Sequence, residues 1–426
     1  MQNFFKKISL IIKDPSLRNR IIFVAVALVV FRFLSVIPVP GIDASKLQAF
    51  FNSSTGDVFG LFNIFSGGGL SKLSIVMLGV GPYITASIVM QLLTMIFPKL
   101  KQMYQEEGEA GRAKFTQYSR LLTVPLALIQ GGGLLLLLQK SNIITQLSSL
   151  EMVTNIMIII AGSMLLMWIG ELMTEFGIGN GTSLIIFAGI VATVPQSLSQ
   201  LLITFSPSQI PVYIGFIFVA LIVILGVVIV TEAERPIPVT YAKRVRGSKV
   251  YGGVSTYLPL RVNQAGVIPI IFALSILLFP QMIFQYLSTA LPVGIWNTIA
   301  SGILALLKNG WFYSIFYFVL VFLFTYFYTA VTFDPHAISE NLQKNGAFIP
   351  GVRPGQSTSE YIGKVLTRIT LVGATFLGLI AVIPLAMKAI TGNQTLAIGG
   401  TALLIVVSVV IDLMKKIDAQ VSMREY

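Results

Sequence analysis

Ten long apolar segments cross this chain of 426 residues, and almost no ionisable side chain lies within them. A helix needs roughly 20 apolar residues to cross the hydrocarbon core of a bilayer. The segments occupy residues 21–38, 73–97, 121–138, 152–173, 184–203, 212–231, 264–287, 311–332, 367–387 and 396–413. We therefore predict an all-α polytopic membrane protein with ten transmembrane helices.

The scarcity of charge inside these segments limits what the chain can do by itself. Only Arg32 lies well inside a span, whereas Glu171 and Asp412 lie near span ends. Pumps and proton-coupled carriers usually place ionisable pairs within their helices. The chain has no Cys and a single His, His336, which argues against a metal cluster or a catalytic triad. No Walker A sequence is present, so we expect no enzymatic activity, no cofactor, and a partner as the energy source.

The distribution of basic residues predicts the orientation. With the N-terminus inside, 23 of the 29 Lys and Arg residues fall on cytoplasmic segments, five on external segments, and Arg32 within a span. Cytoplasmic loops of membrane proteins carry such an excess of Lys and Arg. We therefore expect a multi-pass protein of the cytoplasmic membrane with both termini in the cytoplasm. The formal net charge of +12 is first of all a topology signal.

Ten spans divide into two groups of five, in an N-terminal half (1–203) and a C-terminal half (204–426). An odd number of spans per half gives the halves opposite orientations in the membrane. This permits an inverted repeat about an axis in the membrane plane, an architecture common among transport proteins. The sequence contains no convincing residue-level repeat, so the prediction rests on the span count.

One apolar segment is too short to span the bilayer. Residues 57–71 read DVFGLFNIFSGGGLS and contain Gly67, Gly68 and Gly69, after which a full span begins. The ordinary interpretation is an interfacial or re-entrant helix. The sharper one is a stopper in a cavity that swings on the glycines, which adopt backbone angles closed to other residues. Irregular backbone at membrane depth needs surrounding protein or a water-filled cavity.

Two cytoplasmic loops, about 232–263 and 333–366, are much longer than a connection requires. Long loops with defined chemistry are usually functional. Topology and contact with anionic membrane lipids could account for the basic residues of the first loop. They do not account for its repeated Pro and Gly residues, which indicate hairpin-like shapes presented to a partner.

Several polar residues stand on apolar faces: Thr85, Ser87, Gln91 and Asn263. Hydrogen bonds between helices, worth about 0.6–2 kcal/mol each, are their ordinary explanation. Ile and Val recur at helical spacing, as in Val80 and Ile84, and this spacing alone is typical of packing or lipid-facing surface.

Five stretches carry a resemblance to a known family. They are LSIVMLGVGPYITASIVMQLLT (73–94), EEGEAGRAKFTQYSRLLTV (106–124), GIGNGTSLIIFAGIV (177–191), LPLRVNQAGVIPIIFA (258–273) and NLQKNGAFIPGVRPGQST (341–358). In this order, and over the whole chain, they resemble the SecY family, the large subunits of the bacterial protein-conducting channel. The resemblance implies an hourglass channel made of two inverted five-helix halves, with a short re-entrant plug helix. It also implies a seam between spans 2–3 and spans 7–8 that opens toward lipid.

The resemblance assigns roles to particular positions. The pore ring would consist of Val80, Ile84, Ile186, Ile190, Ile271 and Ile405; many relatives carry Ile at the first of these positions. The plug would occupy about 57–70, with Phe59, Leu61, Ile64, Gly67, Gly68 and Gly69. The lateral gate would include Thr85, Gln91 and Asn263, and we expect a hydrogen bond between the last two to hold the seam shut. Partner docking would involve Arg353, Lys243, Arg244, Arg246 and Lys249.

The implied function is passage of unfolded secretory polypeptides across the cytoplasmic membrane, with sideways release of apolar segments into lipid. The implied partners are small SecE-like and SecG-like membrane subunits, a SecA-type ATPase, the ribosome, signal peptides and nascent chains. A small-solute secondary transporter is the alternative, but it should have a polar or ionisable midplane site. A structural assembly protein and an intramembrane enzyme are weaker alternatives, because the apolar constellation favours conduction and the sequence offers no catalytic pair.

Overall fold

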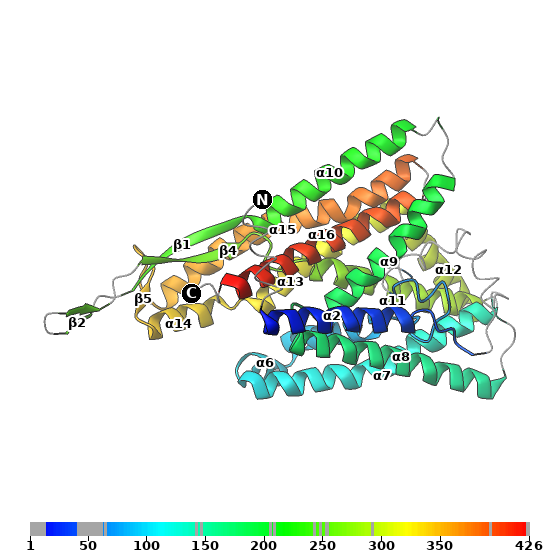
Figure 1. Ribbon diagram of the computed structural model, residues 1–426, viewed down its shortest axis with the longest axis horizontal. Coiled ribbons are helices and arrows are strands. Elements are labelled where there is room, and N and C mark those ends of the chain that lie inside the picture. Colours follow the sequence, from blue (N-terminus) through cyan, green and yellow to red (C-terminus); the bar gives the residue numbers. More distant parts are fainter. Residues whose placement is uncertain are drawn as a thin grey trace.

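The computed structural model describes residues 14–40, 63, 66–140, 144, 148–203, 207, 210–241, 244–246, 249–251, 255–290, 294–391 and 394–422. Ten helices in these ranges match the predicted spans, and most run lengthwise through the molecule (Figure 1). They are α2 (Pro15–Leu34), α5 (Gly81–Ile96), α7 (Gly108–Lys140), α8 (Ser149–Phe176), α9 (Gly181–Ile203), α10 (Ile210–Glu232), α11 (Ile268–Ala290), α13 (Gly310–Thr332), α15 (Gln356–Thr391) and α16 (Gln394–Ser422).

Within the described ranges, five helices are long and apolar enough to cross a membrane by themselves, namely α7, α8, α10, α13 and α15. Helix α5 passes this test only together with α6 (Pro98–Gln105), from which a bend of 112° separates it. The bend follows from Pro98, because a proline disfavours helical backbone in the preceding residue. Phe97 is accordingly extended, with φ −107° and ψ 108°.

The segment before α5 differs from the prediction. We expected a helix from residue 73, but residues 66–80 form turns and α5 begins at Gly81, with Pro82 in its first turn. Non-local contacts explain the difference: Val39 N–H donates to Leu73 O at 2.8 Å, and Ile75 N–H donates to Ile37 O at 3.0 Å. These bonds flank a β-bridge between Pro38 and Ser74 that ties the segment after α2 to the segment before α5, and consecutive tight turns follow up to Gly81.

Helices of each predicted half pack mainly on one another. In the first half, α7 and α8 contact α5, and α8 and α9 contact α2. In the second half, α15 contacts α13, α16 and α10. The principal contacts between the halves join α11 to α5 and α7, and α9 to α16. The first of these interfaces lies between the elements to which the seam was assigned.

The two long loops contain regular structure that an all-α prediction omits. Strands β1 (Glu234–Tyr241), β4 (Ser255–Arg261) and β5 (Ala347–Phe348) form an antiparallel sheet in the order β4-β1-β5. Thr240 pairs with both Ser255 and Phe348, so one strand joins the two loops. A smaller hairpin pairs β2 (Arg244–Arg246) with β3 (Lys249–Tyr251). The hairpin-like shapes predicted for residues 232–263 are confirmed.

A hydrophobic cluster fixes this sheet to the helices. Ile237 and Val239 of β1 pack with Ile349 and with Ile362 and Val365 of α15. The second loop also contains α14 (Pro335–Lys344), which contacts α15 and β5. Because the cluster draws on both loops and on a spanning helix, the sheet is a fixed part of the fold.

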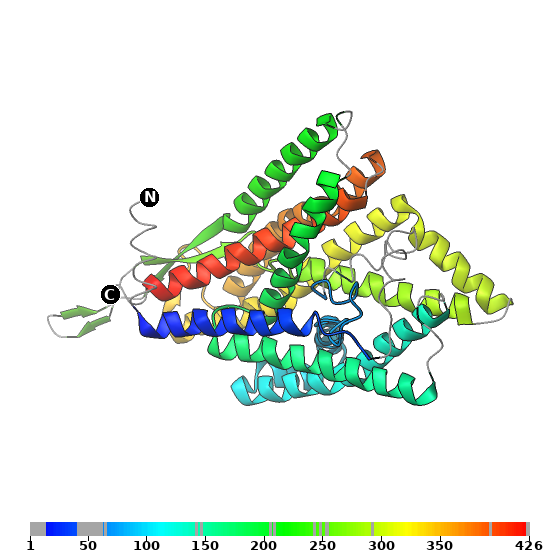
Figure 2. The same ribbon diagram turned by 45° about the vertical axis from the view of Figure 1, so that its right-hand side comes forward.

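The strands, α6, α14, the start of α2 and the end of α16 all lie at one end of the molecule, called here the strand end (Figures 1 and 2). This agrees with ten membrane crossings, because an even number of crossings places the start of the first spanning helix and the end of the last one on the same side of the membrane. Helix α12 (Ile295–Lys308), which the sequence analysis did not anticipate, contacts α11 and α13. Its exposed residues include Ile295 and Trp296.

Candidate functional site

The six residues assigned to the pore ring belong to one buried hydrophobic cluster. None is more than 8% exposed. They come from four helices of both halves: Val80 and Ile84 from the start of α5, Ile186 and Ile190 from α9, Ile271 from α11 and Ile405 from α16. Residues four apart share one helix face, so α5 and α9 each present two aliphatic side chains together. We call these six residues the aliphatic cluster.

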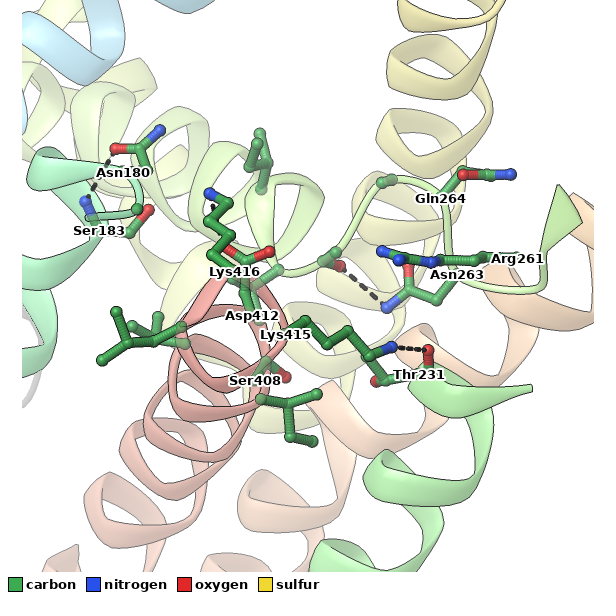
Figure 3. Close-up of a pocket in the computed structure, with 18 of the residues that line it drawn as sticks. Asn180, Ser183, Thr231, Arg261, Asn263, Gln264, Ser408, Asp412, Lys415 and Lys416 are labelled. Atoms are coloured by element: carbon green, nitrogen blue, oxygen red, sulfur yellow. Dashed lines mark hydrogen bonds and ion pairs between the residues drawn. The ribbon is translucent and has the colours of Figure 1, made fainter. Parts of the chain in front are cut away.

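A cavity of about 290 Å³ lies beside the aliphatic cluster. Its wall includes Ser183, Val267 and Val409. In sequence these lie three residues from Ile186, four from Ile271 and four from Ile405, respectively, and in each case on the side toward the strand end. The cavity is therefore about one helical turn from the cluster on that side. Figure 3 labels ten polar residues of its lining, which are Asn180, Ser183, Thr231, Arg261, Asn263, Gln264, Ser408, Asp412, Lys415 and Lys416.

The lysines of this cavity are paired. Lys415 Nζ lies 3.0 Å from Glu232 Oε1 and donates to Thr231 O at 3.0 Å. Lys416 Nζ lies 2.9 Å from Asp412 Oδ2 (Figure 3). The cavity lining thus carries two paired lysines and a third cation, Arg261, whereas the side chains of the adjoining cluster offer no group that could hydrate an ion.

Residues 66–70, called here the glycine turn, approach the aliphatic cluster from the other side. An added Cβ on Gly67 would lie 3.0 Å from the Cα of Gly189, the residue before Ile190, and one on Gly68 would lie 3.8 Å from Thr193 Cγ2. Gly67 and Gly68 have φ of +67° and +80°, the left-handed region that favours glycine. Along α9, cavity, cluster and glycine turn therefore follow one another.

The plug assignment lies mostly outside the described residues. Phe59, Leu61 and Ile64 are among those not described, and Gly67, Gly68 and Gly69 form part of the glycine turn. Gly69 is closely surrounded, because a Cβ there would lie 2.7 Å from Ser74 Oγ. The close packing at two of the three glycines explains why larger residues do not suit this turn.

The three lateral-gate residues form only local hydrogen bonds. Thr85 Oγ1 donates to Gly81 O at 3.0 Å, Gln91 Nε2 donates to Ser87 Oγ at 3.4 Å, and Asn263 Nδ2 donates to Gly266 O at 3.2 Å. The structure shows no hydrogen bond between Gln91 and Asn263, although both are described; that expectation is corrected. Each amide nitrogen donates to a group close in sequence: that of Gln91 to Ser87, four residues earlier, and that of Asn263 to Gly266, three residues later. Gln91 Oε1 and Asn263 Oδ1 are buried without a hydrogen-bond partner.

Arg353 follows a tight turn at the strand end. Val352 N–H donates to Ile349 O at 3.1 Å, and Pro350 is followed by Gly351 with φ +82°, the pattern of a type II turn. The Arg353 carbonyl accepts a hydrogen bond from Thr358 Oγ1 at 2.8 Å, and its side chain is exposed. Of the other docking candidates, Lys243 is not described. Only the backbone of Arg244, Arg246 and Lys249 is described, and it lies in β2 and β3.

Two contacts made by arginine side chains were not predicted from the sequence. Arg120 of α7 and Glu171 of α8 form a bidentate pair, with Nε–Oε1 and Nη2–Oε2 distances of 2.9 Å. Arg32 of α2 donates from Nη1 to Gly67 O at 2.9 Å. The position of Arg32 inside a span was the only sequence signal for the second contact. Within the described ranges, no Asp, Glu, Lys, Arg or His is buried, and no three metal-ligating side chains gather.

Comparisons with known proteins agree on one family. The SecY family model matches residues 74–414. The protein translocase subunit SecY of Thermotoga maritima is 44% identical over 424 residues, which cover 97% of this chain and 95% of the relative. A solved structure of a protein-conducting channel superimposes with a TM-score of 0.66 at 20% identity, covering 96% of this chain and 93% of that one. Sec61 in the canine ribosome–channel complex gives 0.61 at 19% identity, with coverages of 96% and 93%.

The family match extends over most of the chain, and the fold agrees with that of the solved channels. The aliphatic cluster, the cavity lining except Lys415 and Lys416, and nine of the ten helices listed above lie wholly or mostly within residues 74–414. The chain belongs to the SecY family.

Proposed function

We propose that this chain is the channel-forming subunit of a protein translocase, which passes unfolded secretory polypeptides across the cytoplasmic membrane. The supporting observation is the order of cavity, aliphatic cluster and glycine turn along α9. A polar vestibule suits an entering peptide chain, and a deformable apolar constriction suits a substrate of any sequence.

The aliphatic cluster is the proposed pore ring. A narrow apolar constriction raises the cost of hydrated ions by dewetting. Ile and Val are stiff at χ1, so their rotamers are well defined at rest. They make no directional bonds, and the hydrophobic contacts that close the ring are non-directional as well. The ring can therefore yield around a polypeptide and close again after it.

The two halves are proposed to be residues 1–203 and 204–426, joined by the connection between α9 and α10. Contacts of α11 with α5 and α7 form the proposed lateral seam, and a separate contact of α9 with α16 also joins the two halves. A helical segment gains about 0.3–0.6 kcal/mol for each Leu, Ile, Phe or Val at the membrane centre. A long apolar segment therefore favours leaving through the seam into lipid.

Energy is proposed to come from a SecA-type ATPase or a translating ribosome that docks at the strand end, which then faces the cytoplasm. Arg353 and the basic residues Lys243, Arg244, Arg246 and Lys249 suit acidic protein surface or ribosomal RNA phosphates. The relative named in the canine complex is itself bound to a ribosome. Only 11% of the apolar stretch that lets α10 cross a membrane is buried within this chain. The rest of the helix surface is therefore open to SecE-like or SecG-like subunits and to lipid.

The test is reconstitution of the purified protein, with its small membrane subunits, into liposomes. An unfolded secretory substrate should become protected from added protease only when the ATPase, ATP and an apolar signal segment are all present. Omission of ATP is the control. Saturable uptake of a small solute without any motor, together with no substrate protection, would instead establish the secondary-transporter alternative.

The lateral-gate residues yield a prediction that does not need a bond between them. Replacing Gln91 and Asn263 by Leu removes two amides that must face lipid when the seam opens; transfer of an amide costs about 1–3 kcal/mol by mutational estimates. Since each Leu contributes about 0.3–0.6 kcal/mol, the two amides together correspond to at least about three leucines, and we expect signal segments with that many fewer leucines to be accepted. The measurement is the export of a signal series of graded hydrophobicity.

Asn155→Leu is the matched control for this pair. Asn155 of α8 is also a buried amide with an unpartnered atom, Nδ2, and the principal contacts of α8 are with helices of its own half. An unchanged threshold in the double variant, or an equal change in the control, would count against a gate role for Gln91 and Asn263.

A further inference from the structure

Arg32 is the one ionisable residue well inside a predicted span, and the proposed channel function gives it no task. It lies in the last turn of α2. Its Nη1 donates to Gly67 O at 2.9 Å and to Ser35 Oγ at 3.4 Å, and the first contact is partly buried. Hydrogen bonds from a charged donor are shorter and about twice as strong as neutral ones. A charge at this depth is costly, so its partner is functionally informative.

The glycine turn fits closely around α2 at this point. Arg32 Nη1 lies 4.0 Å from the position of a Cβ on Gly68, and Phe31 Cζ lies 2.6 Å from that of a Cβ on Gly67. Only residues without a Cβ allow the Gly67 backbone to come so near to Phe31. Successive residues of α2 therefore hold the turn in two ways, one by packing and one by a directed hydrogen bond.

The other hydrogen bonds of the glycine turn remain within its own segment. Leu70 N–H donates to Ser66 Oγ at 3.0 Å, Ser71 Oγ donates to Gly68 O at 2.8 Å, and Ser74 N–H donates to Gly69 O at 2.8 Å. Among the described residues, the bond from Arg32 is the one that ties this turn to a spanning helix. Removing it leaves the internal structure of the turn intact but loosens its attachment.

We propose that Arg32 is a positioning residue that holds the glycine turn against α9 beside Ile190 and thereby favours the closed channel. The link to closure rests on the proposed function; the attachment itself does not. The competing explanation is that Arg32 only stabilises the C-terminal end of α2 through its charge, as cations near a helix C-terminus do. The two explanations differ in whether the turn moves when the guanidinium is removed.

The attachment can be measured with a single introduced cysteine, because the chain has none. Thr193 Cγ2 lies 3.8 Å from the position of a Cβ on Gly68, so the turn covers this part of α9. In a Thr193→Cys background, we expect Arg32→Gln to raise the rate of labelling by a membrane-impermeant maleimide about tenfold. This matches the loss of one hydrogen bond to a charged group. Arg32→Lys should give a smaller rise.

Arg18→Gln is the matched control, because it removes the same charge from the exposed beginning of α2. Its labelling rate should equal that of the parent. Gly67→Ala is a second route to the same state: its methyl group would clash with Phe31 while Arg32 is retained. It should also raise labelling, and it keeps the test decisive if Arg32→Gln inserts poorly.

Single-channel recording in planar bilayers tests the link to closure. Arg32→Gln and Gly67→Ala should open about tenfold more often than the parent. Unchanged labelling in both variants would overturn the attachment. Raised labelling with unchanged ion flux would overturn the link to closure and leave the attachment standing. A parent protein that conducts polypeptide in no reconstitution would speak against the proposed function, and the labelling result would still stand.

Discussion

Replacing Ile186 and Ile190 together by Ser is expected to make the resting channel leak ions. Both side chains are 1% exposed and lie within the aliphatic cluster of four helices. Serine removes most of their volume and adds hydroxyl groups that hold water, so the constriction no longer dewets. Truncation of a buried Ile to a small residue also costs about 2–5 kcal/mol of stability. Planar-bilayer recording should change from a silent baseline to frequent openings.

Ile159→Ser separates the leak from general destabilisation. Ile159 of α8 is fully buried but belongs to the second hydrophobic cluster, away from the aliphatic cluster. It should lose a comparable amount of stability per residue and remain electrically silent. Equal leakage from this control, or silence of the double variant in a correctly inserted protein, would remove the aliphatic cluster from its proposed role as the pore ring.

Arg353→Glu is expected to abolish motor-driven translocation while leaving the protein in the membrane. The side chain is exposed, the turn before it is closed by the bond from Val352 N–H to Ile349 O, and Thr358 Oγ1 contacts only the Arg353 carbonyl. The turn should therefore survive the substitution. Removing one partner of a close interfacial charge pair costs about 2–5 kcal/mol, or roughly thirtyfold and more in affinity. Reversing the sign adds repulsion to that loss.

The measurement is the affinity of the ATPase for proteoliposomes, together with ATP-dependent substrate protection. Lys344→Glu is the control, because Lys344 is an exposed cation at the same end, paired with Glu340 at 3.0 Å. It should change affinity only slightly, as exposed ion pairs contribute about 0–1 kcal/mol. Equal losses in both variants would indicate a diffuse electrostatic surface rather than a specific contact at Arg353.

The spanning helices were predictable because a bilayer imposes long apolar runs that a single sequence displays directly. The start of α5 was not, because residues 73–80 are apolar but form turns, and residues 73–75 bond to residues 37–39, which are distant in the sequence. Helix α12 has 14 residues, too few for the span criterion. The pairing of β5 with β1 joins loops about a hundred residues apart and has no local signal.

The site was predictable only in part. Spacing alone could not distinguish Val80 and Ile84 from lipid-facing residues; motif positions grouped them with Ile271 and Ile405, and the structure has all four in one buried hydrophobic cluster. The expected bond between Gln91 and Asn263 was wrong because local partners compete for each amide. The contact of Arg32 with Gly67 spans 35 residues of sequence, and hydropathy could indicate only that the arginine needed a partner.

The β1–β4 hairpin is built as a stiff lever. A single residue, Ala233, connects α10 to β1. Its carbonyl accepts a hydrogen bond from Val262 N–H at 2.9 Å, which closes the base of the hairpin. The residue after β4, Val262, packs closely against α15: a Cβ added to Gly373 would lie only 2.5 Å from Val262 O. After this contact with α15 the chain enters α11, and Ile271 lies in the first turn of that helix. A load applied to the far end of the hairpin would therefore act on α11, the helix that contributes to the proposed seam and carries Ile271 of the proposed pore ring.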